Sequence, residues 1–117
     1  LYTLTSINMY NQKDLIRINQ EIGESGELNQ NSSLSFALSL IKQKKSWIFE
    51  LSYLVRSLVI DHSFVDGNKR TAYLICTLYF EHNNRDYDDE KIVETIYKLA
   101  KNNITDINKI GRELLKC

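Results

Sequence analysis

Apolar residues in this chain recur at the three- and four-residue spacing of amphipathic helices rather than at alternate positions, as they would in strands. The first such segment covers residues 12–22. Ser32 or Ser33, and then Ser46, offer N-caps for a second and a third helix. Residues 72–80 are apolar nearly all round, which is typical of a central, buried helix.

Two further helices follow the polar run at residues 81–86. Asp88 can cap a fifth helix and Thr105 a sixth. The chain has no proline, so four glycines provide most of the helix breaks. We therefore predict an all-α fold, a compact bundle of about six helices around a central buried helix that starts near Asn68.

Length, charge and cysteine content narrow the class of protein. The 117 residues suffice for a single domain, 1–117, and 15 basic residues balance 15 acidic ones. This neutral balance argues against a general duplex-DNA binder and a membrane-surface protein, and no apolar run approaches the roughly 20 residues of a membrane span. Cys76 and Cys117 lack the spacing of a zinc site, and we expect two reduced thiols. The expected setting is cytoplasmic, with no nucleic-acid and no membrane partner.

Two polar loops interrupt the helical pattern. Residues 23–31 form a connection longer than the roughly two to eight residues usual in helical bundles. Such a loop is either a mobile surface segment or a functional one. The second loop, residues 62–70, reads HSFVDGNKR and leads into the predicted central helix.

The second loop combines residue types suited to binding phosphate. The first turn of a helix presents unpaired N–H groups and the positive end of the helix dipole. Gly67 allows close approach of the backbone, and Asn68 can cap the helix or bind an oxygen. Lys69 and Arg70 add cationic donors.

The same loop also carries groups suited to catalysis. Asp66 is a hard oxygen ligand of the kind that Mg²⁺ prefers, and His62 is a histidine, the residue type best suited to proton transfer near neutral pH. Together these are the kinds of group that phosphoryl or nucleotidyl transfer uses. Taken singly, each has an ordinary interpretation as a surface histidine, a turn with an N-cap, or a solvated cation. Phe64 is interpreted as an anchor that buries its ring, and His82 as a surface histidine. The tyrosines at 53, 73, 79, 87 and 97 are interpreted as packing residues rather than a base-stacking platform.

The order of residues 62–70 resembles a known signature. It fits H-x-F-x-[DE]-[GA]-N-x-R of the Fic/Doc superfamily at every defined position, and residues 71–74, TAYL, continue it as in the death-on-curing (Doc) branch. Residues 26–28 and 33–38 are similar, more weakly, to the family's glycine-led flap and the helix after it. The resemblance implies the helical Fic fold and transfer of part of a nucleotide to a hydroxyl of a target protein. In most Fic members that part is AMP. In Doc it is the terminal phosphate of ATP, passed to a threonine of the translation factor EF-Tu.

The resemblance assigns roles within the loop. His62 would be the general base that takes the proton of the target hydroxyl. Asp66 would hold Mg²⁺ together with the ATP phosphates, and Phe64 would anchor the loop in the core. The phosphate-binding residues would be Gly67, Asn68, Lys69 and Arg70.

Three positions bear on the choice between the branches. Tyr73 stands where AMP-transferring members carry a second arginine, and Lys69 stands where many of them have glycine; both features resemble Doc. Gly67 is the residue usual in Fic proteins, since Doc tends to carry alanine. We favour a Doc-like protein kinase toxin, with a Fic-type adenylyltransferase as the alternative and a catalytically inactive partner-binding module as a third possibility.

Two further expectations follow from the resemblance, one on the first loop and one on how the protein's activity is regulated. Five residues of this loop would form a flap that docks the target as an extended strand beside His62. They are Gly23, Gly26, Glu27, Leu28 and Asn29. No stretch fits the self-inhibitory element [ST]-x-x-x-E-[GN] of some Fic proteins, so we expect regulation by a separate antitoxin protein.

Overall fold

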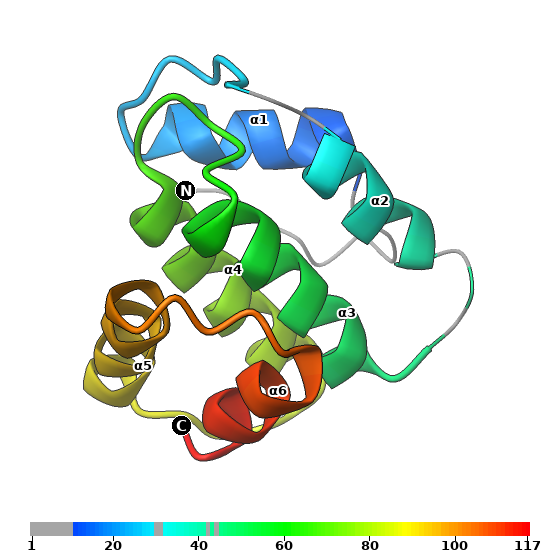
Figure 1. Ribbon diagram of the computed structural model, residues 1–117, viewed down its shortest axis with the longest axis vertical. Helices are drawn as coiled ribbons and strands as arrows, with labels where there is room; N and C mark the ends of the chain where they lie inside the picture. The colour runs from blue at the N-terminus through cyan, green and yellow to red at the C-terminus, as the bar shows by residue number, and fades with distance from the viewer. Residues whose placement is uncertain (1–10, 30–31, 42, 44) are drawn as a thin grey trace.

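Figure 1 shows the computed structural model, which describes residues 11–29, 32–41, 43 and 45–117. In these ranges the chain forms six α-helices and one π-helical segment, η1. They are α1 (Gln12–Glu21), α2 (Ser32–Ile41), α3 (Trp47–Val55), η1 (Arg56–Ile60), α4 (Asn68–His82), α5 (Asp89–Lys101) and α6 (Ile107–Leu115). The prediction of an all-α bundle of about six helices is confirmed. No helix in these ranges is both long and apolar enough to cross a lipid bilayer.

The core of the bundle is built around α4. This helix contacts α1, α3, η1 and α5, and Ala72, Ile75, Cys76 and Phe80 are fully buried along it. Burial of this kind on a nearly all-apolar helix confirms the predicted central helix. The polar start of α4 is therefore held at a fixed place in the fold.

Side-chain caps fix most of the helix starts. Ser46 accepts a hydrogen bond from the Phe49 amide at 3.3 Å, and Asp88 accepts from the amides of Glu90 and Lys91. Both predicted caps are confirmed. Ser32 is the first residue of α2, and the residue before it lies outside the described ranges.

The predicted cap of the last helix is wrong by one residue. Asp106, not Thr105, is the N-cap of α6, and its carboxylate accepts from the Asn108 amide at 3.0 Å. The carbonyl of Thr105 instead accepts a hydrogen bond from the Arg56 guanidinium at 3.3 Å. Threonine and aspartate are both good caps, so sequence alone does not separate two neighbours.

The apolar residues that follow Ser46 extend to Val59, but α3 ends as a regular α-helix at Val55. After Val55 it widens into η1, where the Asp61 amide bonds to the carbonyl of Arg56 five residues back. The carbonyl of Ser57 accepts instead from the amide of Ser63 at 3.2 Å and from its hydroxyl at 2.7 Å. These competing bonds tie the following loop to the end of the helix, and π-turns of this kind are frequent at functional sites.

Candidate functional site

His62 lies where the chain leaves η1. Its backbone adopts a left-handed conformation with φ of 51°, uncommon for a residue with a side chain, and its imidazole is exposed. Its carbonyl accepts from the side-chain amide of Asn29 at 3.4 Å. Backbone strain in non-glycine residues clusters at functional positions. The strain here turns the chain so that Ser63 and Phe64 enter the core while His62 stays at the surface.

Asn68 closes the loop by binding the backbone of Phe64. Its side-chain oxygen accepts from the Phe64 amide at 2.9 Å, and its side-chain nitrogen donates to the Phe64 carbonyl at 2.8 Å. The ring of Phe64 is 1 % exposed, which confirms the predicted anchor. Two uses were expected of Asn68, a helix cap or a hydrogen bond to an oxygen. Gly67 is the N-cap of α4, so the structure shows the second use, to the carbonyl oxygen of Phe64, and not the first. In this structure Asn68 therefore shapes the turn before α4, with both ends of its amide bonded to Phe64.

Gly67 fits its position better than a residue with a side chain would. Its φ of +74° is left-handed, and a Cβ at this position would lie 2.5 Å from Cγ of Glu24. The carboxylate of Asp66 accepts from the Gly67 amide at 3.0 Å and is otherwise exposed. The turn before α4 is thus tight, and the side chain of Glu24 lies across it.

Asn19 is a buried residue of α1 that sequence reasoning missed. Its side-chain nitrogen donates to the carbonyl of Asp66 at 3.0 Å and to the hydroxyl of Thr71 at 3.1 Å. Its side-chain oxygen accepts from the Gly26 amide at 2.9 Å. One amide therefore joins α1, both loops and the start of α4. The available signal was an asparagine on the apolar face of the first predicted helix, next to Ile18.

The predicted flap runs beside the second loop (Figure 1). Leu28 forms an antiparallel bridge with Phe64. The Asn29 amide donates to the Ser63 carbonyl at 2.8 Å, and the Val65 amide donates to the Glu27 carbonyl at 3.0 Å. Residues 30 and 31 of this loop lie outside the described ranges. The structure thus places residues 27–29 next to His62.

The cations at the start of α4 have no carboxylate partner within the described residues. Arg70 is exposed and Lys69 is half-buried, and the two ion pairs found in this part of the chain both belong to Glu113. The amides of the first turn of a helix have no acceptor within the helix. Positive charge and N–H donors therefore converge there, where an anion can bind.

Two cavities meet beside this helix start. One, of about 340 Å³, is mainly apolar and lies between α4 and α5, with Arg70 at its edge. The other, of about 420 Å³, is lined by His62 and Lys101. Lys69 and Tyr97 line both cavities, and the ammonium of Lys69 lies 5.7 Å from the centre of the Tyr97 ring. Lys69 thus separates the side of the site that holds His62 from the side that holds Arg70.

Tyr97 departs from the sequence interpretation, whereas Tyr73 agrees with it and packs against the core. Tyr97, read as a packing residue, is 59 % exposed. Tyr73 lines the apolar cavity, and its hydroxyl donates to Asp89 at 2.7 Å. This hydrogen bond, aided by partial burial, raises the pKa of Tyr73 from an ordinary 10 to about 12, which extends the pH range over which its hydroxyl stays protonated. A tyrosine is not positively charged in either protonation state, so Tyr73 adds no cation to the site.

His82 and the cysteines agree with the sequence interpretation. His82 is exposed at the end of α4, far along the helix from its start. Cys76 is buried and Cys117 half-buried, and neither is in a disulfide. Burial raises the pKa of the Cys76 thiol, which disfavours its reactive thiolate form.

Comparison with known proteins does not assign the chain to a family. No protein-family model, no curated protein and no solved structure matches the chain at a significant level.

Proposed function

We propose that the protein is a Doc-like toxin of the Fic/Doc superfamily, which transfers the γ-phosphate of ATP to a serine or threonine hydroxyl of a target protein. The observation that carries the proposal is the arrangement of one loop. It presents the exposed His62 beside a cavity, and it ends in a helix start where Lys69 and Arg70 have no carboxylate partner in the described chain. The order of residues in this loop supplies the resemblance to the family.

The proposed reaction needs a base and an anion site. The hydroxyl oxygen of the target attacks the γ-phosphorus and forms a new P–O bond. The bond from that phosphorus to the β–γ bridging oxygen breaks, and ADP leaves with the electron pair. An imidazole nitrogen of His62 takes the hydroxyl proton, a role worth about 10²- to 10⁴-fold in rate. Arg70 and Lys69 stabilise the negative charge on the phosphates.

Asp66 fits a magnesium ion that arrives with the nucleotide. Its exposed carboxylate is a hard oxygen donor, and Mg²⁺ in nucleotide sites commonly takes one or two carboxylates along with phosphate oxygens. When bound, Mg²⁺ would supply neutralisation of phosphate charge. The bond from Asp66 to the Gly67 amide holds the carboxylate at the turn.

The flap suits the docking of an extended target segment. Because Glu27 and Asn29 bond to the second loop, the backbone N–H and C=O of Leu28 point to the opposite edge. We propose that a target strand pairs along that edge and so presents its hydroxyl near His62. By its resemblance to Doc, the expected target is a translation factor such as EF-Tu, and a separate antitoxin is the expected regulator.

Labelled nucleotides test the proposed reaction. Purified protein is incubated with Mg²⁺, EF-Tu and ATP carrying the label at either the α- or the γ-phosphate. Label on EF-Tu from γ-labelled ATP alone supports the proposal, and the same assay in a cell extract covers other targets. Label from α-labelled ATP would show AMP transfer, the alternative that Gly67 favours. No transfer from either nucleotide, and no binding of ATP, would leave the inactive partner-binding module.

A further inference from the structure

The carbonyl of Ser57 determines how the chain leaves η1. In a regular α-helix this carbonyl would accept a hydrogen bond from the amide of Asp61, four residues further on. The Asp61 amide instead bonds to the Arg56 carbonyl at 3.1 Å. The Ser57 carbonyl accepts from the amide of Ser63 at 3.2 Å and from its hydroxyl at 2.7 Å. Ser63, the residue after His62, therefore occupies the acceptor that a regular helix would need.

The hydroxyl bond of Ser63 is buried and short. Ser57 and Ser63 are both 0 % exposed, so water does not compete for this carbonyl. The hydroxyl contact is also shorter than the amide contact. A buried hydroxyl without a partner is strongly disfavoured, whereas the Asp61 amide has an acceptor in either form of the turn. The side chain of Ser63 therefore favours the widened turn over a regular helical one.

The direction of His62 depends on this turn. His62 has a φ of 51°, whereas a residue in a regular helix has a φ of about −63°. A return to the regular turn would rotate the residues after it around the helix axis, by about 100° for a shift of one position. The amide and the side chain of Asn29 bond to the carbonyls of Ser63 and His62, at 2.8 Å and 3.4 Å respectively. These bonds join the flap to the same conformation.

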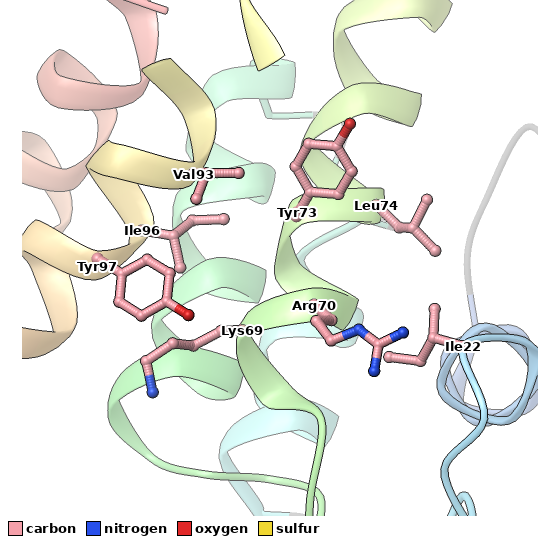
Figure 2. Close-up of a pocket in the computed structure, with 8 residues that line it drawn as sticks. All are labelled: Ile22, Lys69, Arg70, Tyr73, Leu74, Val93, Ile96 and Tyr97. Atoms are coloured by element: carbon pink, nitrogen blue, oxygen red, sulfur yellow. The ribbon is translucent and has the colours of Figure 1, made fainter. Parts of the chain in front are cut away.

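The imidazole of His62 lies on one side of the start of α4. His62 lines the cavity on the side of Lys69, and Arg70 borders the other cavity. Figure 2 shows that Lys69 extends below the ring of Tyr97, whereas Arg70 points away from that ring, toward Ile22. A rotation of the chain at residue 62 would therefore take the imidazole away from Lys69 and from the cavity that they share.

We propose that Ser63 is a positioning residue for His62. Its hydroxyl, by holding the Ser57 carbonyl, keeps the backbone of His62 left-handed and its imidazole beside the cavity that Lys69 lines. Ser63 stands at an undefined position of the signature that residues 62–70 fit, so the resemblance assigns it no role. The effect of Ser63 on the conformation of His62 is independent of the proposed function, and only its effect on catalysis rests on that function.

Nuclear magnetic resonance of the full chain tests the conformation. A positive φ brings the amide and α protons of one residue close together and so gives a strong Overhauser effect between them. We expect this signal at His62 in the parent and in the control Ser52→Ala, and its loss in Ser63→Ala. Ser52 is matched because it is buried and its hydroxyl also donates to a backbone carbonyl at 2.7 Å, that of Ile48. A signal that persists in Ser63→Ala, or that is absent from the parent, would overturn the proposal.

Ser63→Cys guards against loss of folding in Ser63→Ala. A thiol fills the space of the hydroxyl but is a weak donor, so we expect the same loss of the His62 signal without a cavity. Retention of the signal in Ser63→Cys together with its loss in Ser63→Ala would show that side-chain volume, and not the hydrogen bond, holds His62. That result would also overturn the proposal.

Initial rates of γ-label transfer separate this proposal from the proposed function. Ser63→Ala should lower kcat about 10- to 100-fold, because a small displacement of a catalytic group is costly. It should leave KM for ATP within about twofold, because Lys69 and Arg70 stay in place, and Ser52→Ala should match the parent. If Ser63→Ala transfers label at the parent rate while His62→Ala does not, the role of Ser63 in catalysis is refuted and the proposed function stands. If the parent transfers no label but Ser63→Ala loses the His62 signal, the proposed function is refuted and the positioning of His62 by Ser63 stands.

Discussion

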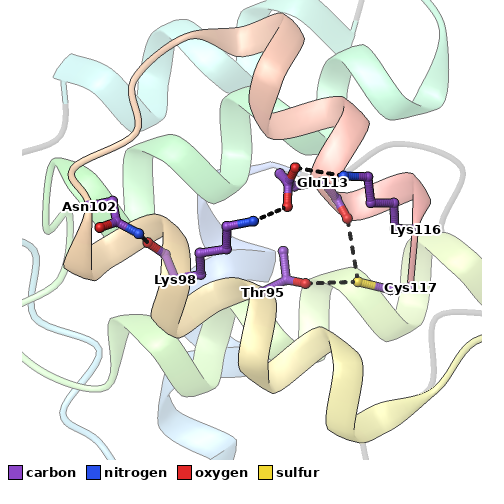
Figure 3. A network of polar contacts seen from close by, with 6 residues as sticks. All are labelled: Thr95, Lys98, Asn102, Glu113, Lys116 and Cys117. Atoms are coloured by element: carbon purple, nitrogen blue, oxygen red, sulfur yellow. Dashed lines mark hydrogen bonds and ion pairs between the residues drawn. The ribbon is translucent and has the colours of Figure 1, made fainter.

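Polar groups are paired in different ways in two regions of the molecule. One is the loop end, formed by residues 23–29 and 62–70, and the other is the C-terminal end, formed by α5, α6 and the residues that follow. At the loop end, neutral side chains make the bonds: Asn19 and Asn68 together make four hydrogen bonds to backbone and one to the Thr71 hydroxyl, which fix the turn before α4. At the C-terminal end, charges bind charges. Glu113 on α6 accepts from Lys98 of α5 at 2.7 Å and from Lys116 at 3.0 Å (Figure 3).

This difference shows which charges are available to a ligand. Pairing with Glu113 holds the ammonium groups of Lys98 and Lys116 near the protein's own carboxylate. Lys69 and Arg70 have no such partner in the described residues, and their backbone is positioned by neutral groups that do not neutralise them. The loop end therefore combines a hydrogen-bonded backbone with cations that no carboxylate of the described residues neutralises, as an anion site requires.

The largest expected effect is on catalysis and concerns His62. His62→Ala should lower the initial rate of γ-label transfer about 10²- to 10⁴-fold, because the general base is lost. The exposed imidazole contributes little to packing, so the melting temperature should stay nearly unchanged. His82→Ala is the matched control, since His82 is the other histidine of the chain and is also exposed. Equal loss of rate in both variants would contradict a specific role for His62.

Asn19 should give the largest effect on stability. Asn19→Ala leaves the buried amide of Gly26 and the carbonyl of Asp66 without their partner, at an expected cost of about 2–4 kcal/mol in the free energy of unfolding. Asn102→Ala removes an exposed bond to the Lys98 carbonyl and should cost less than about 0.5 kcal/mol. Urea unfolding of the two variants measures the difference. Equal, small losses would show that the loop is held by other contacts.

Gly67 and Gly23 provide a test of how tightly the loop is packed. Both have left-handed φ angles, so alanine at either position should cost about 1 kcal/mol in backbone strain. At Gly67 the new Cβ also meets Glu24, whereas at Gly23 it meets nothing within 4 Å. Urea unfolding should therefore show a larger loss for Gly67→Ala, by about another 1 kcal/mol. Adding Glu24→Ala should recover most of this excess. A failure to recover it would mean that the other close contact of this Cβ, 3.2 Å from the side-chain nitrogen of Asn19, sets the excess.

Local sequence patterns predicted most of the helices, because interactions between residues close in the chain largely determine where a helix forms. Apolar spacing located α1 through Leu15 and Ile18 and identified α4 as the buried helix, and residue chemistry singled out the loop at residues 62–70. The same reasoning interpreted Tyr97 as a packing residue. That interpretation was wrong because the apolar face of α5 is wider than the surface that α4 covers.

The contacts that position the site depend on segments far apart in the chain. Asn19 and Asp66 are 47 residues apart, and no spacing rule relates them. The widened turn at η1 likewise depends on Ser63 competing for the carbonyl of Ser57. The sequence therefore identifies the chemical groups of the candidate site, whereas the contacts that hold these groups in place are seen only in the three-dimensional structure.

The smallest effect is expected at Glu113 and depends on pH. Hydrogen bonds from Lys98 and Lys116 lower the pKa of Glu113 from an ordinary 4.5 to about 2. A carboxylate with a lowered pKa in the folded state contributes stability above its ordinary pKa, and that contribution is lost as the pH falls from about 4.5 through about 2. Both lysines are largely exposed, so the gain at pH 7 should stay below about 1 kcal/mol.

Comparing the parent with Glu113→Gln checks this expectation and completes the contrast between the two ends. Urea midpoints should differ slightly at pH 7 and converge as the pH falls below about 2, where the carboxylate becomes protonated in the folded as well as the unfolded chain. A gap that persists well below pH 2 would mean that packing of Glu113, rather than its charge, joins α6 to α5. Added salt should narrow the gap at pH 7. The same salt should leave the stability cost of Asn19→Ala almost unchanged, because the bonds of Asn19 are neutral and buried.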